Sequence, residues 1–324
     1  MSAVESIWIT GAAGLLGANL TLEFLDRDIA VLPITRGPGL CISGVASVAC
    51  DLTDARAVSA LFAQTPPSCI VHCAAVTNVD WCEAHPDEAM RVNAHAAGQL
   101  AAQARACGAC FIHISTDAIF DGLSGGYAED NPPHPLNVYA RTKLAGEQAV
   151  FHAMPGALIL RINLFGWNLQ PRLSLAEWVL DRLENNQPVP GFRDVIFAPI
   201  LANQLAPWIL RLVELGATGI FHAGSSDHIT KFDFARLVAE IFALDASLVR
   251  ESSVAAASLA APRPRNLWLN TGKLAAALGH PLPTVRQGLE QFKTLRQNGF
   301  VQRLKSAAPQ PASQPFRSGA PCQR

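Results

Sequence analysis

A run of glycines between the first strand pattern and the first helical pattern constrains this 324-residue chain more than any other feature. Residues 6–10 form an apolar, β-rich run that leads directly into TGAAGLLG at 10–17 and then into a helical pattern. Gly11, Gly14 and Gly17 lack the Cβ atoms that would keep a pyrophosphate away from the backbone, and the helix N-terminus supplies unpaired N–H groups. The spacing is G-x-x-G-x-x-G rather than G-x-G-x-x-G. Its place between strand and helix nevertheless indicates a dinucleotide-binding turn rather than an ordinary tight turn.

The first half of the chain alternates short apolar runs with longer helical patterns. After the strand at 6–10 and the helix at 15–26, strands are expected at 30–35, 45–49, 69–73, 110–115 and 157–161, and helices near 54–64, 86–107 and 137–152. Continuous apolar strands separated by helices indicate a parallel sheet that is covered on both faces. The pattern therefore predicts an α/β fold, a Rossmann-like doubly wound parallel sheet with a smaller C-terminal substrate-binding domain.

The second half is less regular, with helical patterns near 174–185, 201–215 and 231–243. We expect an NAD(P)-binding Rossmann domain over residues 1–170 and a substrate-binding region over 171–303 that interleaves with it. The last stretch, 304–324, contains several prolines and few large apolar side chains, which predicts a disordered tail.

Composition and charge exclude several classes of protein. Hydrophobic residues make up 50% of the chain and charged residues 16%, which excludes a disordered protein. The formal net charge of -1 lacks the excess of basic residues that binding to nucleic acid or to an anionic membrane requires. No run is apolar enough to span a bilayer, no cationic segment precedes the first apolar run, and no cysteine or histidine cluster has zinc spacing. We therefore expect a cytoplasmic protein without a metal site.

The end of the second strand predicts which cofactor the glycine turn binds. Sites for NAD place Asp or Glu there to hold the ribose hydroxyls, whereas this strand ends in Thr35 and Arg36. A cation suits the additional phosphate of NADP, so NADP(H) is favoured over NAD(H), the alternative being a solvated loop arginine. Asp51 and Leu52 are candidates for the adenine edge, unless Asp51 belongs to the start of the following helix.

A tyrosine and a lysine four residues apart carry the candidate chemistry. Tyr139 and Lys143 fall on a predicted helix, and their spacing places them on one face. A nearby ammonium favours the phenolate and lowers the pKa of a tyrosine, which can then pass a proton to a carbonyl oxygen. Ser115-Thr116-Asp117 supplies a hydroxyl at the carboxyl end of a strand, the edge at which doubly wound sheets bind ligands. Thr116, Tyr139 and Lys143 are therefore the candidate catalytic residues.

Together these motifs resemble an extended short-chain dehydrogenase/reductase of the dTDP-4-dehydrorhamnose reductase family. The matching stretches are TGAAGLLG (10–17), HCAAVTNVDWCE (72–83), RVNA (91–94), HISTDAIFDG (113–122), NVYARTKLAGEQAV (137–150) and RPRNLWLNTGKL (263–274). They follow the order of the family from residue 10 to about residue 292. The resemblance implies an NAD(P)-binding Rossmann domain, a smaller substrate domain and a nucleotide-sugar substrate.

The resemblance also implies roles for matched residues. Tyr139 would donate the proton, and Lys143 would hold the nicotinamide ribose. Thr116 would bind the substrate carbonyl beside Asp117. The remaining cofactor contacts would come from Gly11, Gly14, Leu15, Leu16, Gly17, Cys73, Ala74 and Ala75.

The sugar-binding positions depart from the family pattern. Leu164 stands where rhamnose reductases commonly carry a tryptophan that contacts the sugar, and residues 194–200 keep only the aspartate and proline of a D-Q-x-G-x-P-T stretch. Arg263 is a candidate for gripping a substrate phosphate, the alternative being a surface-loop arginine. The regulatory β subunit of methionine adenosyltransferase, an NADP-binding partner of an enzyme, shares similar stretches, so Tyr139 and Lys143 alone do not establish turnover.

Three hypotheses follow for function. The first is an NADPH-dependent reductase of the C4 carbonyl of a nucleotide-linked 4-keto-6-deoxy sugar, as in dTDP-rhamnose biosynthesis, acting as a homodimer or alone. The second is a non-catalytic NADP-binding regulatory subunit of another enzyme such as methionine adenosyltransferase. The third is a nucleotide-sugar epimerase or dehydratase that holds NAD, against which Arg36 argues.

Overall fold

The computed structural model describes residues 6–37, 39–256 and 261–309. Within these residues, seven parallel strands form one sheet in the order β13-β8-β7-β6-β1-β2-β5. The strands are β1 (Ser6–Thr10), β2 (Ala30–Thr35), β5 (Val48–Ala49), β6 (Cys69–His72), β7 (Cys110–Thr116), β8 (Leu158–Ile162) and β13 (Gly219–Ala223). This is the Rossmann-like α/β fold that the alternation of strands and helices predicts.

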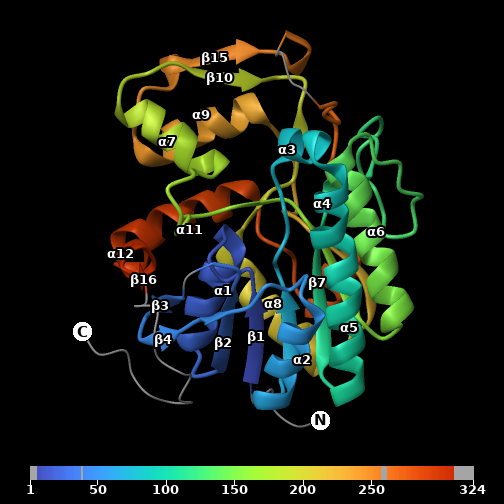
Figure 1. Ribbon diagram of the computed structural model, residues 1–324. Coiled ribbons are helices and arrows are strands. Elements are labelled where there is room, and N and C mark those ends of the chain that lie inside the picture. The colour runs from blue at the N-terminus through green and yellow to red at the C-terminus, as the bar shows by residue number, and fades with distance from the viewer. Residues whose placement is uncertain (1–5, 38, 257–260, 310–324) are drawn as a thin grey trace.

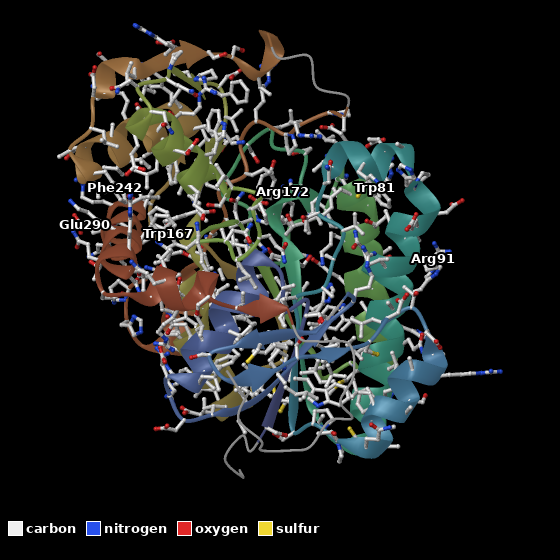
Figure 2. The ribbon with its side chains drawn as sticks, turned by 60° about the vertical axis from the view of Figure 1, so that its left-hand side comes forward. Trp81, Arg91, Trp167, Arg172, Phe242 and Glu290 are labelled. Atoms are coloured by element: carbon white, nitrogen blue, oxygen red, sulfur yellow. The ribbon has the colours of Figure 1, made fainter. Side chains whose placement is uncertain are left out.

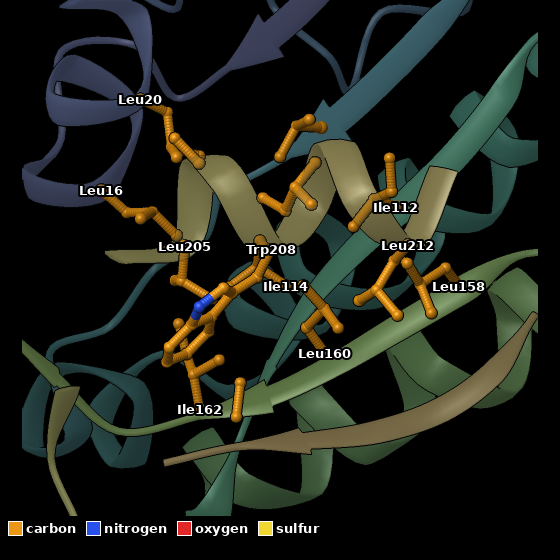
Figure 3. Close-up of a cluster of buried hydrophobic side chains, with 14 of the residues drawn as sticks. Leu16, Leu20, Ile112, Ile114, Leu158, Leu160, Ile162, Leu205, Trp208 and Leu212 are labelled. Carbon is orange, nitrogen blue, oxygen red and sulfur yellow. The ribbon is translucent and has the colours of Figure 1, made fainter. Parts of the chain in front are cut away.

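Helices cover both faces of this sheet (Figure 1). They are α1 (Leu15–Leu25), α2 (Ala55–Gln64), α3 (Val79–Ala84), α4 (Pro86–Met90), α5 (Ala96–Cys107), α6 (Val138–Ala153), α8 (Leu205–Glu214) and α10 (Gly272–Leu278). On one face, apolar side chains of α1 and α8 pack on the strands, and Figure 3 shows Trp208 of α8 among them. On the other face, Leu61, Leu100 and Val150 from α2, α5 and α6 pack with Trp8 and Phe111 of the sheet. Both faces are therefore dry, which explains the continuous apolar strands.

The remaining elements form a smaller region beyond the carboxyl edge of the sheet (Figure 1). Its helices are α7 (Leu175–Glu184), α9 (Lys231–Phe242), α11 (Val285–Gln297) and α12 (Phe300–Lys305), and its strands are β9 (Leu164–Phe165), β10 (Val189–Phe192), β11 (Ile196–Phe197), β12 (Ile200–Leu201), β14 (Ile229–Thr230) and β15 (Val249–Ser252). Short helical turns occur at Ala202–Gln204, Ala246–Leu248 and Val254–Ala256. Trp167, labelled in Figure 2, stacks on Phe292 with ring centroids 4.0 Å apart and donates a 2.9 Å hydrogen bond to its carbonyl oxygen.

Two predicted elements differ from those observed in the first half. The strand expected at 45–49 is divided, because β4 (Val45–Ala46) forms an antiparallel hairpin with β3 (Leu40–Ile42) and only β5 joins the sheet. The helix expected at 86–107 is interrupted by a turn of π-helix at Arg91–His95. Neither Ser47, where the strand divides, nor the segment 91–95 contains a proline or glycine, so the sequence gives no local signal of either interruption.

The described part of the predicted tail adopts regular structure. Leu304 is buried at the end of α12, and β16 (Ala308–Pro309) pairs with β3. The prediction of a disordered tail is therefore wrong for residues 304–309, because long-range packing and pairing stabilise a segment whose composition resembles a tail. Residues 310–324 lie outside the described residues.

The strand order creates a switch point between β1 and β6. The chain leaves β1 toward β2 on one side and returns to β6 on the other, and such a reversal opens a crevice at the carboxyl edge. Thr10 ends β1 and His72 ends β6, and the Thr10 hydroxyl lies 2.8 Å from His72 Nδ1. Among the described helices, none is long and apolar enough to cross a membrane.

Candidate active site

The glycine turn lies at this switch point and brings bare backbone to it. Gly11 has a φ of +66°, and a Cβ there would lie 2.8 Å from the backbone of Ala74. A Cβ on Gly17 would overlap the carbonyl oxygen of Gly11, so this glycine lets α1 pack close to the turn. Gly14 is the N-cap of α1 and has no side chain to cover the N–H groups of Leu15 and Leu16. The turn thus retains a cradle for a pyrophosphate, which fits a dinucleotide cofactor.

The edge beyond β2 carries positive charge. Thr35 is buried, while Arg36 is exposed at the strand end. Asp51 accepts hydrogen bonds from the backbone and hydroxyl of Thr53, which hold the pKa of its carboxyl below the usual value, and the charges of Arg36 and Arg91 lower it further. Arg91, labelled in Figure 2, was not singled out in the sequence, because only the fold brings it within electrostatic range of Asp51.

Leu52, predicted beside Asp51 at the adenine edge, is partly buried and packs against the apolar cluster under α2.

The loop after β6 is tied to α6 by Asn93. This residue lies in the π-helical turn, is 1% exposed, and both accepts from the backbone N–H of Val76 (2.8 Å) and donates to its carbonyl (3.1 Å). It also donates to the Thr142 hydroxyl of α6 at 3.0 Å. Cys73, Ala74 and Ala75, predicted to pass the cofactor, precede this clamp, so Asn93 sets their distance from α6. The π-turn is the structural signal for its role, since such turns cluster at functional sites.

Gly146 allows α6 to approach the π-turn, and its replacement by alanine should move the helix. An added Cβ would overlap the carbonyl oxygen of Asn93. We expect Gly146→Ala to lower the free energy of unfolding by about 1–3 kcal/mol, as overpacking does. Urea denaturation measures this, and Gly156→Ala is the matched control because open space surrounds that position. Equal stability of the two variants would contradict this account of the helix contact.

The structure brings the three candidate catalytic residues to the carboxyl edge. Asn137 caps α6 through a 2.9 Å bond from the Ala140 N–H, and Tyr139 and Lys143 follow on one face. The Lys143 ammonium donates to the carbonyl of Ile114 at 2.7 Å and lies 3.5 Å from His113 Nε2. Thr116 ends β7, and its hydroxyl lies near enough to the Tyr139 phenol to oppose the rise in the phenol's pKa that burial causes.

The expected lowering of the Tyr139 pKa by Lys143 is not what the free protein shows. Burial raises the pKa of Tyr139 to about 12, and the charges of Asp117 and Cys82 add to this. Burial also lowers the pKa of Lys143 to about 8, against the opposing charge of Glu147. The prediction is wrong because the ammonium is directed at the Ile114 carbonyl and at His113 rather than at the phenol. The phenol is therefore protonated at neutral pH.

Ser115 serves a different purpose from Thr116. Its hydroxyl donates a short hydrogen bond to Glu147, whose carboxylate pairs with Arg161 at 2.8 Å. Both charged side chains are 3% exposed, and Arg161 also lies 3.3 Å from His222 Nε2. Sequence patterns missed this pair, because Glu147 and Arg161 come from a helix and a strand that only the fold brings together. The pair anchors α6 below Lys143.

The predicted substrate residues have different surroundings. Asp117 is buried beside Thr116. Arg263 is half-buried and forms a 2.9 Å ion pair with Asp80. Leu164 lies in β9 and packs against the main apolar cluster. The assignment of Leu164 and Arg263 to substrate therefore rests on position in the family pattern.

Comparisons with known proteins agree with this fold. Residues 5–297 match the family model described as the RmlD substrate binding domain. A probable low-salt glycan biosynthesis reductase of Haloferax volcanii is 34% identical over 291 residues, covering 87% of this chain and 95% of the relative. Methionine adenosyltransferase 2 subunit beta of Xenopus tropicalis is 34% identical over 273 residues, covering 82% and 80%. The solved dTDP-4-dehydrorhamnose reductase of Bacillus anthracis in complex with NADP has a TM-score of 0.81 and 26% identity, covering 90% of this chain and 99% of that one.

Proposed function

Because this chain belongs to the RmlD substrate binding domain family, we propose that it is an NADPH-dependent reductase of a nucleotide-linked 4-keto-6-deoxy sugar. The family is one of Rossmann-fold oxidoreductases, and the solved relatives include dTDP-4-dehydrorhamnose reductases. The observation that carries the proposal is the meeting of Thr116, Tyr139 and Lys143 beside the glycine turn. The ammonium of Lys143 interacts electrostatically with the thiol of Cys73. The backbone of the next residue, Ala74, packs against Gly11, so Lys143 lies near the glycine turn.

The side chains suit acid catalysis at a carbonyl. NADPH, when bound, supplies the hydride; Gly11, Gly14 and Gly17 would hold its pyrophosphate and Lys143 its nicotinamide ribose. Tyr139 donates its phenolic proton to the carbonyl oxygen, which becomes a hydroxyl. Thr116 holds this oxygen by a hydrogen bond and keeps it next to the phenol. Burial of the site strengthens these hydrogen bonds relative to water.

NADPH oxidation by the purified protein tests the proposal. With dTDP-4-dehydro-L-rhamnose present, absorbance of NADPH should fall in proportion to the sugar added, and without it the absorbance should stay constant. NADPH binding without oxidation, across a panel of nucleotide 4-keto sugars, would contradict the proposal.

A regulatory subunit is the second candidate, favoured by the 34% identity to methionine adenosyltransferase 2 subunit beta. In that case the chain would bind NADP and a partner enzyme, with no substrate-dependent oxidation. Size-exclusion chromatography with and without a methionine adenosyltransferase catalytic subunit separates the two candidates, and a stable complex without reductase activity would favour the regulator.

Arg36 is proposed to set the preference for NADPH. Its guanidinium and that of Arg91 both act electrostatically on the carboxylate of Asp51, which follows β5 next to the end of β2, and we assign both cations to the region of an adenosine phosphate. We expect Arg36→Glu to reduce the ratio of NADPH to NADH affinity by about tenfold to a hundredfold, as the loss of one charged hydrogen bond does. Fluorescence titration with both cofactors measures the ratio, with the exposed Arg250→Glu as control. An equal loss of both affinities would contradict this role.

A further inference from the structure

A row of polar groups leads from the phenol into the protein and ends at a buried carboxyl group. The Thr116 hydroxyl lies near the Tyr139 phenol, whose pKa it acts to lower, and it donates a hydrogen bond to Asp117 Oδ1 at 3.2 Å. Asn163, after β8, donates to Asp117 Oδ2 at 2.7 Å. Asp117 is 3% exposed and opens the short 3-10 turn Asp117–Ile119, so its carboxyl group is held in place rather than free in solvent.

A lysine from the second half of the chain lies within electrostatic range of the same carboxyl group. Lys231 begins α9, directly after its N-cap Thr230, and is half-buried. Its ammonium stabilises the Asp117 carboxylate electrostatically, and Arg263 is a second cation, near Lys231. The charged and titratable groups around Asp117 are therefore Lys231 from α9, Tyr139 from α6, and Arg263 beyond Lys231.

We propose that Asp117 stores the proton that reloads Tyr139 between turnovers, with Thr116 as the connecting hydroxyl and Lys231 stabilising the carboxylate left behind. This inference rests on the proposed reductase function, because only the reduction step removes the phenolic proton of Tyr139. It assigns to Asp117 a role other than substrate contact, and it brings Lys231 into the site.

The proton transfers balance without any further reagent. Breaking the phenolic O–H bond delivers a proton to the substrate oxygen and leaves a phenolate. The Thr116 hydroxyl gives its proton to the phenolate and takes one from the Asp117 carboxyl group. One negative charge has then moved from Tyr139 to Asp117, where Asn163 and Lys231 stabilise it. Asp117 then takes up one proton from the bulk solvent, which is the proton that each carbonyl reduction consumes.

The ionisation of Asp117 is suited to this exchange. Burial raises the pKa of its carboxyl group from 3.8 to about 6, although Asn163, Thr116 and Lys231 each oppose the rise. Asp117 is therefore protonated in mildly acidic solution and loses its proton as the pH rises through about 6. We expect kcat to fall on the same rise in pH, and Asp117→Asn to abolish this step of the profile.

Fluorine NMR tests the coupling without any substrate. The chain has two tyrosines, Tyr127 and Tyr139, so fluorotyrosine labelling gives two signals that Tyr127→Phe assigns. The Tyr139 signal should shift as Asp117 titrates at a pH of about 6, and Asp117→Asn should remove this titration. Lys231→Met should move it to higher pH, because the carboxylate loses a stabilising charge. A Tyr139 signal that is the same in all three proteins would overturn the relay.

Rapid kinetics then separates a proton store from a substrate contact. In Asp117→Asn, the first turnover starts from a protonated Tyr139 and should proceed at the wild-type rate. Later turnovers should slow by about a hundredfold, the lower end for a positioned acid–base group. The exposed Asp181→Asn is the matched control. Equal slowing of the first and later turnovers, or unchanged steady-state rates, would overturn the proposal. If the wild type oxidises no NADPH with any keto sugar, the reductase function fails, and the NMR titration still decides whether Asp117 and Tyr139 are coupled.

Discussion

Tyr139→Phe is expected to lower kcat for NADPH-dependent reduction by about a hundredfold to ten-thousandfold, the contribution of a positioned general acid. The variant retains the ring and loses only the proton that the carbonyl oxygen receives. NADPH affinity should change little, because the glycine turn and the end of β2 carry most of the cofactor contacts proposed above. Stopped-flow absorbance for kcat and fluorescence titration for NADPH binding measure the two quantities separately.

Tyr127→Phe is the matched control for this experiment. Tyr127 donates a 2.5 Å hydrogen bond to Asp121 and stacks on Phe120, so its hydroxyl supports a loop and takes no part in the proposed proton transfer. We expect this variant to keep its kcat while losing some stability. A Tyr139→Phe protein with wild-type turnover would remove the phenol from the mechanism.

Glu147→Gln is expected to lower the free energy of unfolding by about 3–5 kcal/mol, the usual consequence of breaking a buried ion pair from one side. The variant leaves the Arg161 guanidinium buried with no carboxylate to balance its charge. Replacing both partners, as Glu147→Gln with Arg161→Met, should recover much of this loss, because no unpaired charge then remains in the interior. Urea denaturation of the single and double variants measures the effect.

An exposed ion pair provides the comparison. Arg211 and Glu214 pair at 3.2 Å on α8 with half or more of each side chain in solvent, so Glu214→Gln should change stability by less than about 1 kcal/mol. A loss in Glu147→Gln no larger than in Glu214→Gln would mean that the buried pair does not anchor α6. The Tyr139→Phe and Glu147→Gln experiments are complementary, since Tyr139→Phe tests chemistry on the helix that Glu147 holds.

Local patterns in the sequence were sufficient for much of the first half. The strands expected at 6–10 and 30–35 have the observed bounds, and the glycine turn stands between β1 and α1 as predicted. These features depend on near neighbours in the chain, such as the loss of Cβ atoms at a turn or the four-residue spacing on a helix. The same logic placed Tyr139 and Lys143 on one face of α6.

Elements that depend on distant partners were predicted less well. The segment Gly219–Ala223 was assigned to the substrate-binding region without a strand, yet it forms the edge strand β13 beside β8. Residues 304–309 resemble a tail in composition, yet α12 packs its buried side chains and β16 pairs with β3. In both cases pairing with a remote strand decides the structure, and no local pattern reports it.

The sequence by itself therefore determined the fold class and identified the glycine turn and the candidate catalytic residues, since each follows from local spacing and side-chain chemistry. Only the tertiary structure decided the pKa values and the charge pairings of the site. Burial, rather than Lys143, governs the pKa of Tyr139, and the fold alone joins Asp117 to Lys231 and Glu147 to Arg161. Desolvation and charge pairing act through space between residues far apart in the chain, and sequence spacing does not contain those distances.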